Sequence, residues 1–122
     1  MAKATLYEFL HHNLITDSEQ SPVVAVAADA LVIPVTHPIV GKTSGADAEA
    51  LTLANGLPGQ SLIVNLIVAG GGACTLTPAT SYGWNTVVLL GQYDQVVLLY
   101  VDGTIGWVII GASGTDAPPV IA

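Results

Sequence analysis

Residues 94–110, DQVVLLYVDGTIGWVII, decide the fold class. Two apolar runs rich in β-branched and aromatic residues flank Asp102-Gly103, which predicts a β-hairpin closed by a two-residue type I′ turn. Successive side chains of a strand point to opposite faces of its sheet. In the first run these faces are Val96, Leu98 and Tyr100 on one side and Val97, Leu99 and Val101 on the other. Both faces are apolar, so we expect the strand to be covered on both sides.

The same pattern of short apolar runs separated by turn residues continues on the N-terminal side of this hairpin. We expect strands at 49–54, 61–68, 73–77, 86–90, 94–101 and 104–110. Glycine-rich turns such as Gly70-Gly71-Gly72 stand between them. Several short strands with regular turns are typical of an all-β sandwich or barrel. The sequence therefore predicts an all-β fold, either a compact antiparallel β-sandwich or a barrel-like domain.

The two ends of the chain differ in pattern from its middle. The β domain is predicted to span residues 23–112, with its regular part at 49–112. Residues 1–22 are predicted to form an N-terminal arm, whose apolar residues have a helical spacing that leaves a short helix or an extended arm open. Residues 113–122 contain Pro118-Pro119, which disfavours a central strand, so we expect an extended C-terminal tail.

The segment between the N-terminal arm and the regular strands is apolar but interrupted. Pro34 and Pro38 remove hydrogen-bond donors from it, which favours edge positions in a sheet. We therefore expect one or two short edge strands, around 23–27 and 30–35. Residues 41–48 are mostly small and are expected to form a connector.

The composition excludes several classes of protein. The chain has 122 residues and is 52% hydrophobic but only 9% charged, against about 25% in ordinary soluble domains. Its two lysines cannot neutralise the roughly six to ten phosphates of a typical nucleic-acid site, and its net charge of −7 repels phosphates. A membrane span needs about 20 apolar residues, whereas the longest runs, such as 96–101, are short. We expect neither nucleic-acid binding, nor a membrane span, nor a secretory signal at the N-terminus.

No motif in the chain predicts catalysis, a cofactor or a metal site. Gly41-Lys42-Thr43 ends like a phosphate-binding loop, but Thr36 stands where that loop has its first glycine. His11, His12 and His37 have no carboxylate at ligand spacing, although at a three-fold axis one histidine per subunit would suffice. We expect no enzyme activity.

The remaining polar or reactive residues favour structural roles. Cys74 alternates with Leu76 on an apolar strand face and is expected to be a small buried hydrophobe. Asp94 and Asp102 stand at turns, where an aspartate usually accepts hydrogen bonds from nearby backbone N–H groups. The aromatic residues of the β region can form a platform for a sugar, but aromatic residues are also common in cores and interfaces, which we favour.

The second apolar face of the strands at 61–68, 94–101 and 104–110 needs a covering partner. A single sandwich buries one face of each sheet, and large exposed apolar patches are rare on soluble monomers. We expect a homo-oligomer or a part of a larger assembly. The alternative is a monomer whose arms fold back over the outer faces. The candidate core or interface residues are Trp84, Val97, Leu99, Tyr100, Trp107 and Ile109.

Four stretches resemble structural proteins of tailed bacteriophages. They are ALTLANGLPGQ at 50–60, TLTPAT at 75–80, LLYVDG at 98–103 and GWVIIG at 106–111. In order, and over about residues 33–120, they are similar to small capsid decoration (cement) proteins and to β-modules of phage head or tail fibres. The resemblance implies a homotrimer, or another oligomer, on the outer capsid surface of a virion. It implies the phage major capsid protein as partner and no catalytic residues.

Decoration proteins of this kind bind where capsid subunits meet, often at local three-fold positions, and brace the shell against the pressure of the packaged DNA. If the chain is one of them, Tyr7, Phe9 and Leu10 of the N-terminal arm are the expected capsid contacts. The alternative is a fibre or tail module that binds a host receptor or glycan, with Trp84 or Tyr82 stacking on a sugar ring. A third hypothesis, a secreted β-module unrelated to viruses, is disfavoured because no signal peptide is expected.

Overall fold

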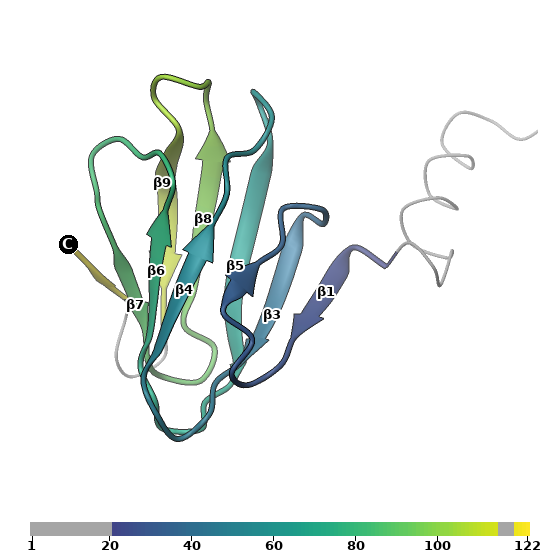
Figure 1. The fold of residues 1–122 in the computed structure, drawn as a ribbon, viewed down its shortest axis with the longest axis vertical. Coiled ribbons are helices and arrows are strands. Elements are labelled where there is room, and N and C mark those ends of the chain that lie inside the picture. The colour runs from purple at the N-terminus through teal and green to yellow at the C-terminus, as the bar shows by residue number, and fades with distance from the viewer. Residues whose placement is uncertain (1–20, 115–118) are drawn as a thin grey trace, which may run out of the picture.

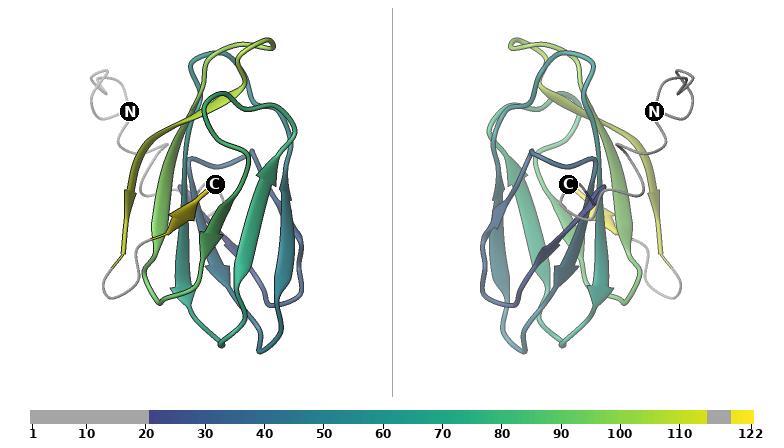
Figure 2. Two further views of the ribbon diagram at one scale, coloured as in Figure 1. Left: turned by 90° about the vertical axis from the view of Figure 1, so that its left-hand side faces the viewer. Right: turned by 90° about the vertical axis from the view of Figure 1, so that its right-hand side faces the viewer.

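The computed structural model describes residues 21–114 and 119–122, and this part of the chain is all-β without a helix. Two five-stranded sheets pack face to face (Figures 1 and 2). Sheet A has the order β1 (Val23–Val26), β3 (Ile39–Thr43), β5 (Ser61–Val68), β8 (Gln95–Tyr100) and β9 (Trp107–Ser113). Sheet B has the order β10 (Val120–Ile121), β7 (Val87–Leu89), β6 (Cys74–Pro78), β4 (Glu49–Leu53) and β2 (Val32–Ile33). The predicted all-β class and two-layer architecture are confirmed, and the sheets do not close into a barrel.

The purely antiparallel arrangement that we expected is wrong, because both sheets are mixed. From β1 to β6 the chain alternates between the sheets, so β1, β3 and β5 are parallel neighbours in sheet A and β2, β4 and β6 in sheet B. From β7 onward the pairing is antiparallel. A chain that crosses to the opposite sheet and back re-enters its first sheet in the same direction. Parallel neighbours need such a crossover, here supplied by a strand of the other sheet.

Three segments differ in detail from the sequence prediction. The start of the expected connector, Gly41 to Thr43, belongs to β3, which lies between β1 and β5. Ser113, assigned to the tail, is the last residue of β9, and Val120–Ile121 form the edge strand β10. Proline indicated edge positions correctly, since β1 and β2 each lie at one edge of a sheet (Figure 1).

The hairpin of β8 and β9 is present, but its predicted type I′ turn is wrong. The strands are joined by residues 101–106, and neither Asp102 nor Gly103 has the positive φ that a type I′ turn requires. Instead Asp102 Oδ1 accepts hydrogen bonds from the N–H groups of Thr104 and Ile105, at 2.9 and 2.7 Å. The positive φ, 74°, falls on Gly106, which ends the turn. The expected capping role of Asp102 is therefore confirmed in a longer loop.

The hydrophobic core lies between the sheets and is built from their inner faces. From sheet A it contains Val26, Val40, Leu62, Val64, Leu66, Val96, Leu98, Tyr100 and Trp107. From sheet B and its loops it contains Ile33, Leu51, Leu53, Cys74, Leu76, Trp84, Val87 and Leu89. These residues alternate along their strands with residues of the outer faces, as the period of a strand requires. Cys74 is fully buried, as predicted.

Trp107 joins the two sheets at one end of the core. Its indole is fully buried, and Nε1 donates a hydrogen bond to the carbonyl oxygen of Ala54 after β4, at 2.9 Å. Its ring meets that of Tyr100 edge to face, with centroids 5.2 Å apart. Trp84 Nε1 in turn donates to the carbonyl oxygen of Trp107 at 3.0 Å. The Trp107 side chain thus joins strands of both sheets, and its backbone carbonyl holds the loop that carries Trp84.

The triplet Gly70-Gly71-Gly72 permits a close approach between two backbone segments. A Cβ on Gly72 would lie 1.9 Å from the carbonyl oxygen of Asp47, and one on Gly70 would lie 2.3 Å from that of Ser44. Hydrogen bonds hold the segments together, since the N–H of Gly72 donates to the carbonyl oxygen of Gly45 at 2.9 Å. Only glycine fits between such segments, which explains the composition of this turn.

Candidate assembly surface

The outer face of sheet A is a continuous apolar surface. We define it by Val23, Ile39, Ile63, Val97, Leu99, Val108 and Ile110. Val23 pairs with Ile39, Ile39 with Ile63, and Ile63 with Val97, so these residues form one row across four strands. Leu99 pairs with Val108 in the next row. The central residues are half-buried by one another, while Val23 and Ile110 at the two edges are 45% and 59% exposed.

The outer face of sheet B is different in chemistry. Its central strands β4 and β6 bring Thr52, Thr75 and Thr77 to the surface, and Thr52 pairs with Thr77. Apolar residues alternate with these threonines and point into the core, as in a sheet with one face in water. Apolar residues are also exposed toward the edges of sheet B, where Val32 is 67% and Val120 is 62% exposed. Threonines separate these edges, so the unbroken apolar surface is the outer face of sheet A.

The outer face of sheet A carries no charge among the residues that the structure describes. Lys42 and Glu49 are buried between the sheets, and Asp94 is buried in the loop before β8. Asp29, Asp47 and Asp102 lie in loops between strands. A polar pair borders the apolar row: Asn65 Nδ2 donates a hydrogen bond to Gln95 Oε1 at 3.0 Å.

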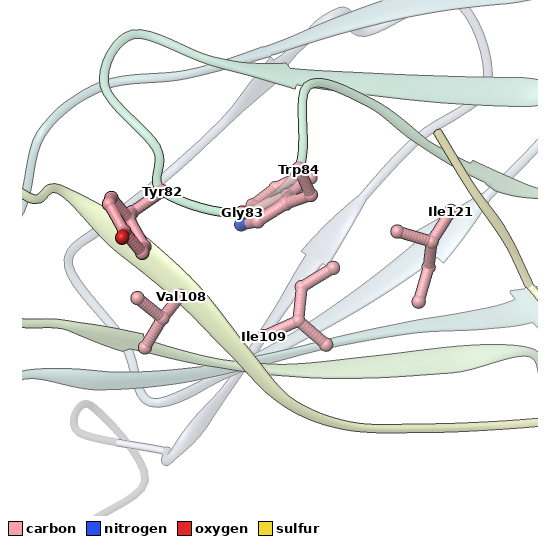
Figure 3. Close-up of a pocket in the computed structure, with 6 residues that line it drawn as sticks. All are labelled: Tyr82, Gly83, Trp84, Val108, Ile109 and Ile121. Atoms are coloured by element: carbon pink, nitrogen blue, oxygen red, sulfur yellow. The ribbon is translucent and has the colours of Figure 1, made fainter.

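A shallow apolar groove of about 400 Å³ lies beside this face, at the edge of the sandwich (Figure 3). It is lined by Tyr82, Gly83, Trp84, Val108, Ile109 and Ile121. Tyr82 is 71% exposed at its rim, whereas Trp84 is only 6% exposed. The hydrogen bond of its indole to Trp107 holds Trp84 in the core. Trp84 cannot present its ring to a sugar in this conformation, but Tyr82 can.

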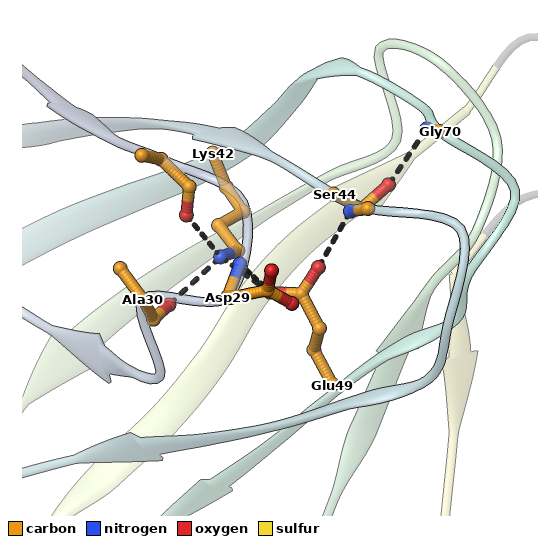
Figure 4. Close-up of polar contacts among 8 residues, drawn as sticks. Asp29, Ala30, Lys42, Ser44, Glu49 and Gly70 are labelled. Carbon is orange, nitrogen blue, oxygen red and sulfur yellow. Dashed lines mark hydrogen bonds and ion pairs between the residues drawn. The ribbon is translucent and has the colours of Figure 1, made fainter.

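A buried ion pair joins the two sheets at the end of β3 (Figure 4). Lys42 Nζ lies 2.7 Å from Glu49 Oε1 and donates hydrogen bonds to the carbonyl oxygens of Ala27 and Ala30, at 2.8 and 2.7 Å. Glu49 also accepts hydrogen bonds from the N–H groups of Asp29 and Gly45, at 3.1 and 2.6 Å. All three donors of the ammonium are therefore paired in a site closed to solvent.

The surroundings of Glu49 and Cys74 set their protonation. Burial alone raises the pKa of the Glu49 carboxyl, but hydrogen bonds from Lys42 and Gly45 and the charge of Lys42 outweigh it, so that the pKa is lowered. Burial raises the pKa of the Cys74 thiol, and the negative charge of Glu49, its neighbour in the sheet, raises it further. A buried thiol with a raised pKa is a poor nucleophile, in line with a structural role.

The structure separates the predicted core or interface residues into two groups. Trp84, Tyr100 and Trp107 lie in the core, and Ile109 packs against it. Val97 and Leu99 lie on the outer face of sheet A. The expected capsid contacts Tyr7, Phe9 and Leu10 lie outside the described residues, as do His11 and His12.

The Lys42–Glu49 pair was missed by the sequence interpretation, which placed Lys42 in a connector. The available signal was the rarity of charge: Lys42 is one of two lysines in the whole chain and follows the apolar run Ile39-Val40. A lone lysine in such a run is costly to bury unless a carboxylate pairs with it. That consideration points to a partner such as Glu49, but it does not identify which of the nine acidic residues it is.

Comparison with known proteins does not assign the chain to a family. No protein-family model matches it, and it has no significant match among curated proteins. Within residues 21–114 and 119–122 no group of three or more histidine, cysteine or acidic side chains is placed to hold a metal ion. The same residues include no helix that is long and apolar enough to cross a membrane.

Proposed function

We propose that this protein is a structural protein of a phage virion that binds the outer capsid surface as an oligomer and stabilises the shell without catalysis. The observation that carries the proposal is the uncharged apolar outer face of sheet A, which no strand of the described part of the chain covers. A monomer rarely exposes such a face, whereas a subunit of an assembly uses it for contacts. The resemblance to decoration proteins indicates that this assembly is a phage capsid.

The stretches that carry the resemblance are neighbours in the fold. The stretches 50–60 and 75–80 contain most of the neighbouring strands β4 and β6 of sheet B. The stretches 98–103 and 106–111 contain the end of β8, most of the turn and most of β9 in the hairpin of sheet A. Trp107 of the last stretch donates its indole hydrogen bond to Ala54 of the first. The resemblance therefore covers a contiguous structural unit rather than scattered segments, which supports the proposal.

The net charge of −7 is compatible with this location. A protein on the outer side of a shell makes no contact with the packaged DNA and needs no basic surface. Labelling of purified virions with an antibody against the protein, followed by image reconstruction, tests the location. Density on the shell at positions between capsid subunits supports the proposal, and density confined to the tail contradicts it.

Deletion of residues 1–22 is expected to abolish capsid binding and to leave the oligomer intact. The deletion ends immediately before β1, so the strand that forms the edge of sheet A is retained. An arm that becomes ordered on the capsid loses conformational entropy, and many contacts are needed to offset that loss. Cosedimentation with empty shells of the parent phage measures binding, and light scattering measures the oligomer.

Point variants refine this test. Combined alanine substitution of Tyr7, Phe9 and Leu10 should reproduce the loss of binding, while alanine substitution of His11, His12 and Asn13 serves as a control of equal size. If the chain without residues 1–22 still binds shells with the affinity of the wild type, the arm is not the capsid contact.

One observation favours a second candidate, a fibre or tail module that binds a host glycan. Tyr82 stands exposed at the rim of the apolar groove, where its ring can stack on a sugar (Figure 3). An exposed aromatic ring beside a shallow groove is a common way to bind carbohydrate faces. A glycan array separates the two candidates: binding that is lost in Tyr82→Ala favours the fibre module.

A further inference from the structure

We propose that the outer face of sheet A is the surface through which copies of this chain bind one another. This inference deepens the proposed function, because it names the partner of that face, and it rests on the chain acting as an oligomer. The occupant is a second copy of the chain. The distribution of charge, the area of the face and the hydrogen bonding of its polar side chains each support this choice.

The distribution of charge fits an identical partner. Two copies, each with a net charge of −7, repel each other unless their contact excludes the acidic groups. Asp29, Asp47 and Asp102 lie in loops, and the outer face of sheet A has no charged side chain among the described residues. A partner of opposite charge would instead gain most from a contact that includes acidic side chains, which this face does not offer.

The dimensions of the face fit a stable interface. Five strands spaced about 4.8 Å apart span roughly 24 Å. The longest strand, β5, has 8 residues, which corresponds to about 26 Å. The other four strands are shorter, with 4 to 7 residues, so the face covers roughly 500 Å² in projection. This is more than half of the ~800 Å² that each partner of a standard interface buries. A sheet of a second copy can pack on it about 10 Å away, as sheets A and B do within one chain.

The polar row beside the apolar one does not oppose such a contact. Asn65 and Gln95 are joined across β5 and β8 by one hydrogen bond, from Asn65 Nδ2 to Gln95 Oε1, at 3.0 Å. Asn65 Oδ1 has no hydrogen-bond partner and is already closed to solvent within the single chain. Covering this oxygen with a second copy therefore removes no further hydration from it. The desolvation penalty that usually limits the burial of amides is largely absent here.

A matched pair of variants tests the inference. Val97 is half-buried in the middle of the face, and Val97→Asp places a carboxylate there in every copy. Thr75, half-buried on the middle strand β6 of sheet B, is the control, as Thr75→Asp adds the same charge to the opposite face. We expect the dissociation constant of the oligomer to rise at least tenfold in Val97→Asp and to stay within twofold of the wild type in Thr75→Asp. Sedimentation velocity at micromolar concentration measures both, with circular dichroism as a check of folding.

Hydroxyl-radical footprinting of the wild-type protein keeps the test valid if Val97→Asp fails to fold. Ile63, Val97 and Leu99 should be protected in the oligomer and become reactive on dilution, while Tyr82 and Leu57 react under both conditions. A wild-type monomer at micromolar concentration, or equal reactivity of the face residues at all concentrations, overturns the inference. A third outcome also overturns it: the face residues are protected in a monomer, and this protection is lost when residues 1–20 are deleted. That result would mean that the chain covers its own face.

The two proposals fail separately. A Val97→Asp variant that stays as oligomeric as the wild type and still decorates shells would contradict the inference about sheet A and leave capsid binding in place. An oligomer that depends on Val97 but does not bind shells would contradict the decoration function and leave the interface in place.

Discussion

Trp107→Ala should lower the free energy of unfolding by about 3–5 kcal/mol, the range seen when large buried aromatic side chains are truncated. The indole is fully buried and meets Tyr100 edge to face. Its removal leaves a cavity at the end of the core where β9 meets the end of β4. It also leaves the carbonyl oxygen of Ala54 without its indole donor. Both effects act in the same direction, so the value should lie toward the upper end of the range.

Denaturation with guanidinium chloride, followed by intrinsic fluorescence and circular dichroism, measures this change. The protein concentration must be held constant, because association adds to the apparent stability of an oligomer. Trp107→Phe retains most of the volume and should lose less than half as much stability. Tyr82→Ala, which truncates an aromatic residue that is 71% exposed, should be within about 1 kcal/mol of the wild type. A loss of less than about 1 kcal/mol in Trp107→Ala would show that this tryptophan does not join the sheets.

Strand positions could be predicted because each strand bears a local pattern, whereas strand pairing could not. The runs at 61–68 and 49–54 correspond closely to β5 and β4, since apolar side chains on one face mark a strand wherever it lies. The neighbour of β5 on one side is β3, however, reached only after the chain has passed through β4 of the other sheet. Turn residues describe connections between consecutive strands and carry no information on such pairings. The mixed sheets therefore become visible only in three dimensions.

For the outer face of sheet A, single residues could likewise be predicted from the sequence, but the strands that form the surface together could not. Val97 and Leu99 were identified from the sequence because apolar residues on the second face of a strand stand out in a chain with 9% charged residues. That β1, β3, β5, β8 and β9 all contribute to one sheet, and thus to one surface, depends on topology. Lys42, in contrast, was predicted to lie in a connector and is buried. A lysine between glycine and threonine suggests an exposed loop, and only the fold shows that Glu49 faces it across the core.

Lys42→Met should lower the free energy of unfolding by about 3–5 kcal/mol, as expected when one partner of a buried ion pair is removed. The methionine side chain fills similar space but leaves the Glu49 carboxylate without its counter-ion in a site closed to solvent. It also removes the two ammonium hydrogen bonds to the carbonyl oxygens of Ala27 and Ala30, in the connection between β1 and β2. Guanidinium denaturation at neutral pH measures the loss.

The double variant Lys42→Met, Glu49→Gln separates the lost charge from the lost packing. The amide oxygen of the glutamine at position 49 can still accept a hydrogen bond from the N–H of Asp29 or Gly45. Neither member of the buried pair is then charged. A buried pair replaced by neutral groups of similar volume is often tolerated, so the double variant should regain most of the stability lost in Lys42→Met. If both variants are equally unstable, the contacts to the backbone, and not the ion pair, hold this end of the sandwich.

The pH dependence of stability provides a second signature of the pair. In the wild type the pKa of Glu49 is lowered from its ordinary value of 4.5, so its contribution to stability is complete above that value and is lost as the pH falls through the folded pKa. In Lys42→Met the hydrogen bond and the charge of Lys42 are lost and only the backbone hydrogen bonds from Gly45 and Asp29 still oppose burial, so the pKa of Glu49 rises relative to the wild type. The variant therefore gains stability relative to the wild type as the pH falls, because protonation removes its unpaired charge. The difference in unfolding free energy between the two proteins should be largest at neutral pH and narrow steadily below about pH 5. If the difference in unfolding free energy does not depend on pH, Glu49 is not ionised in the folded protein. Its contact with Lys42 is then not an ion pair.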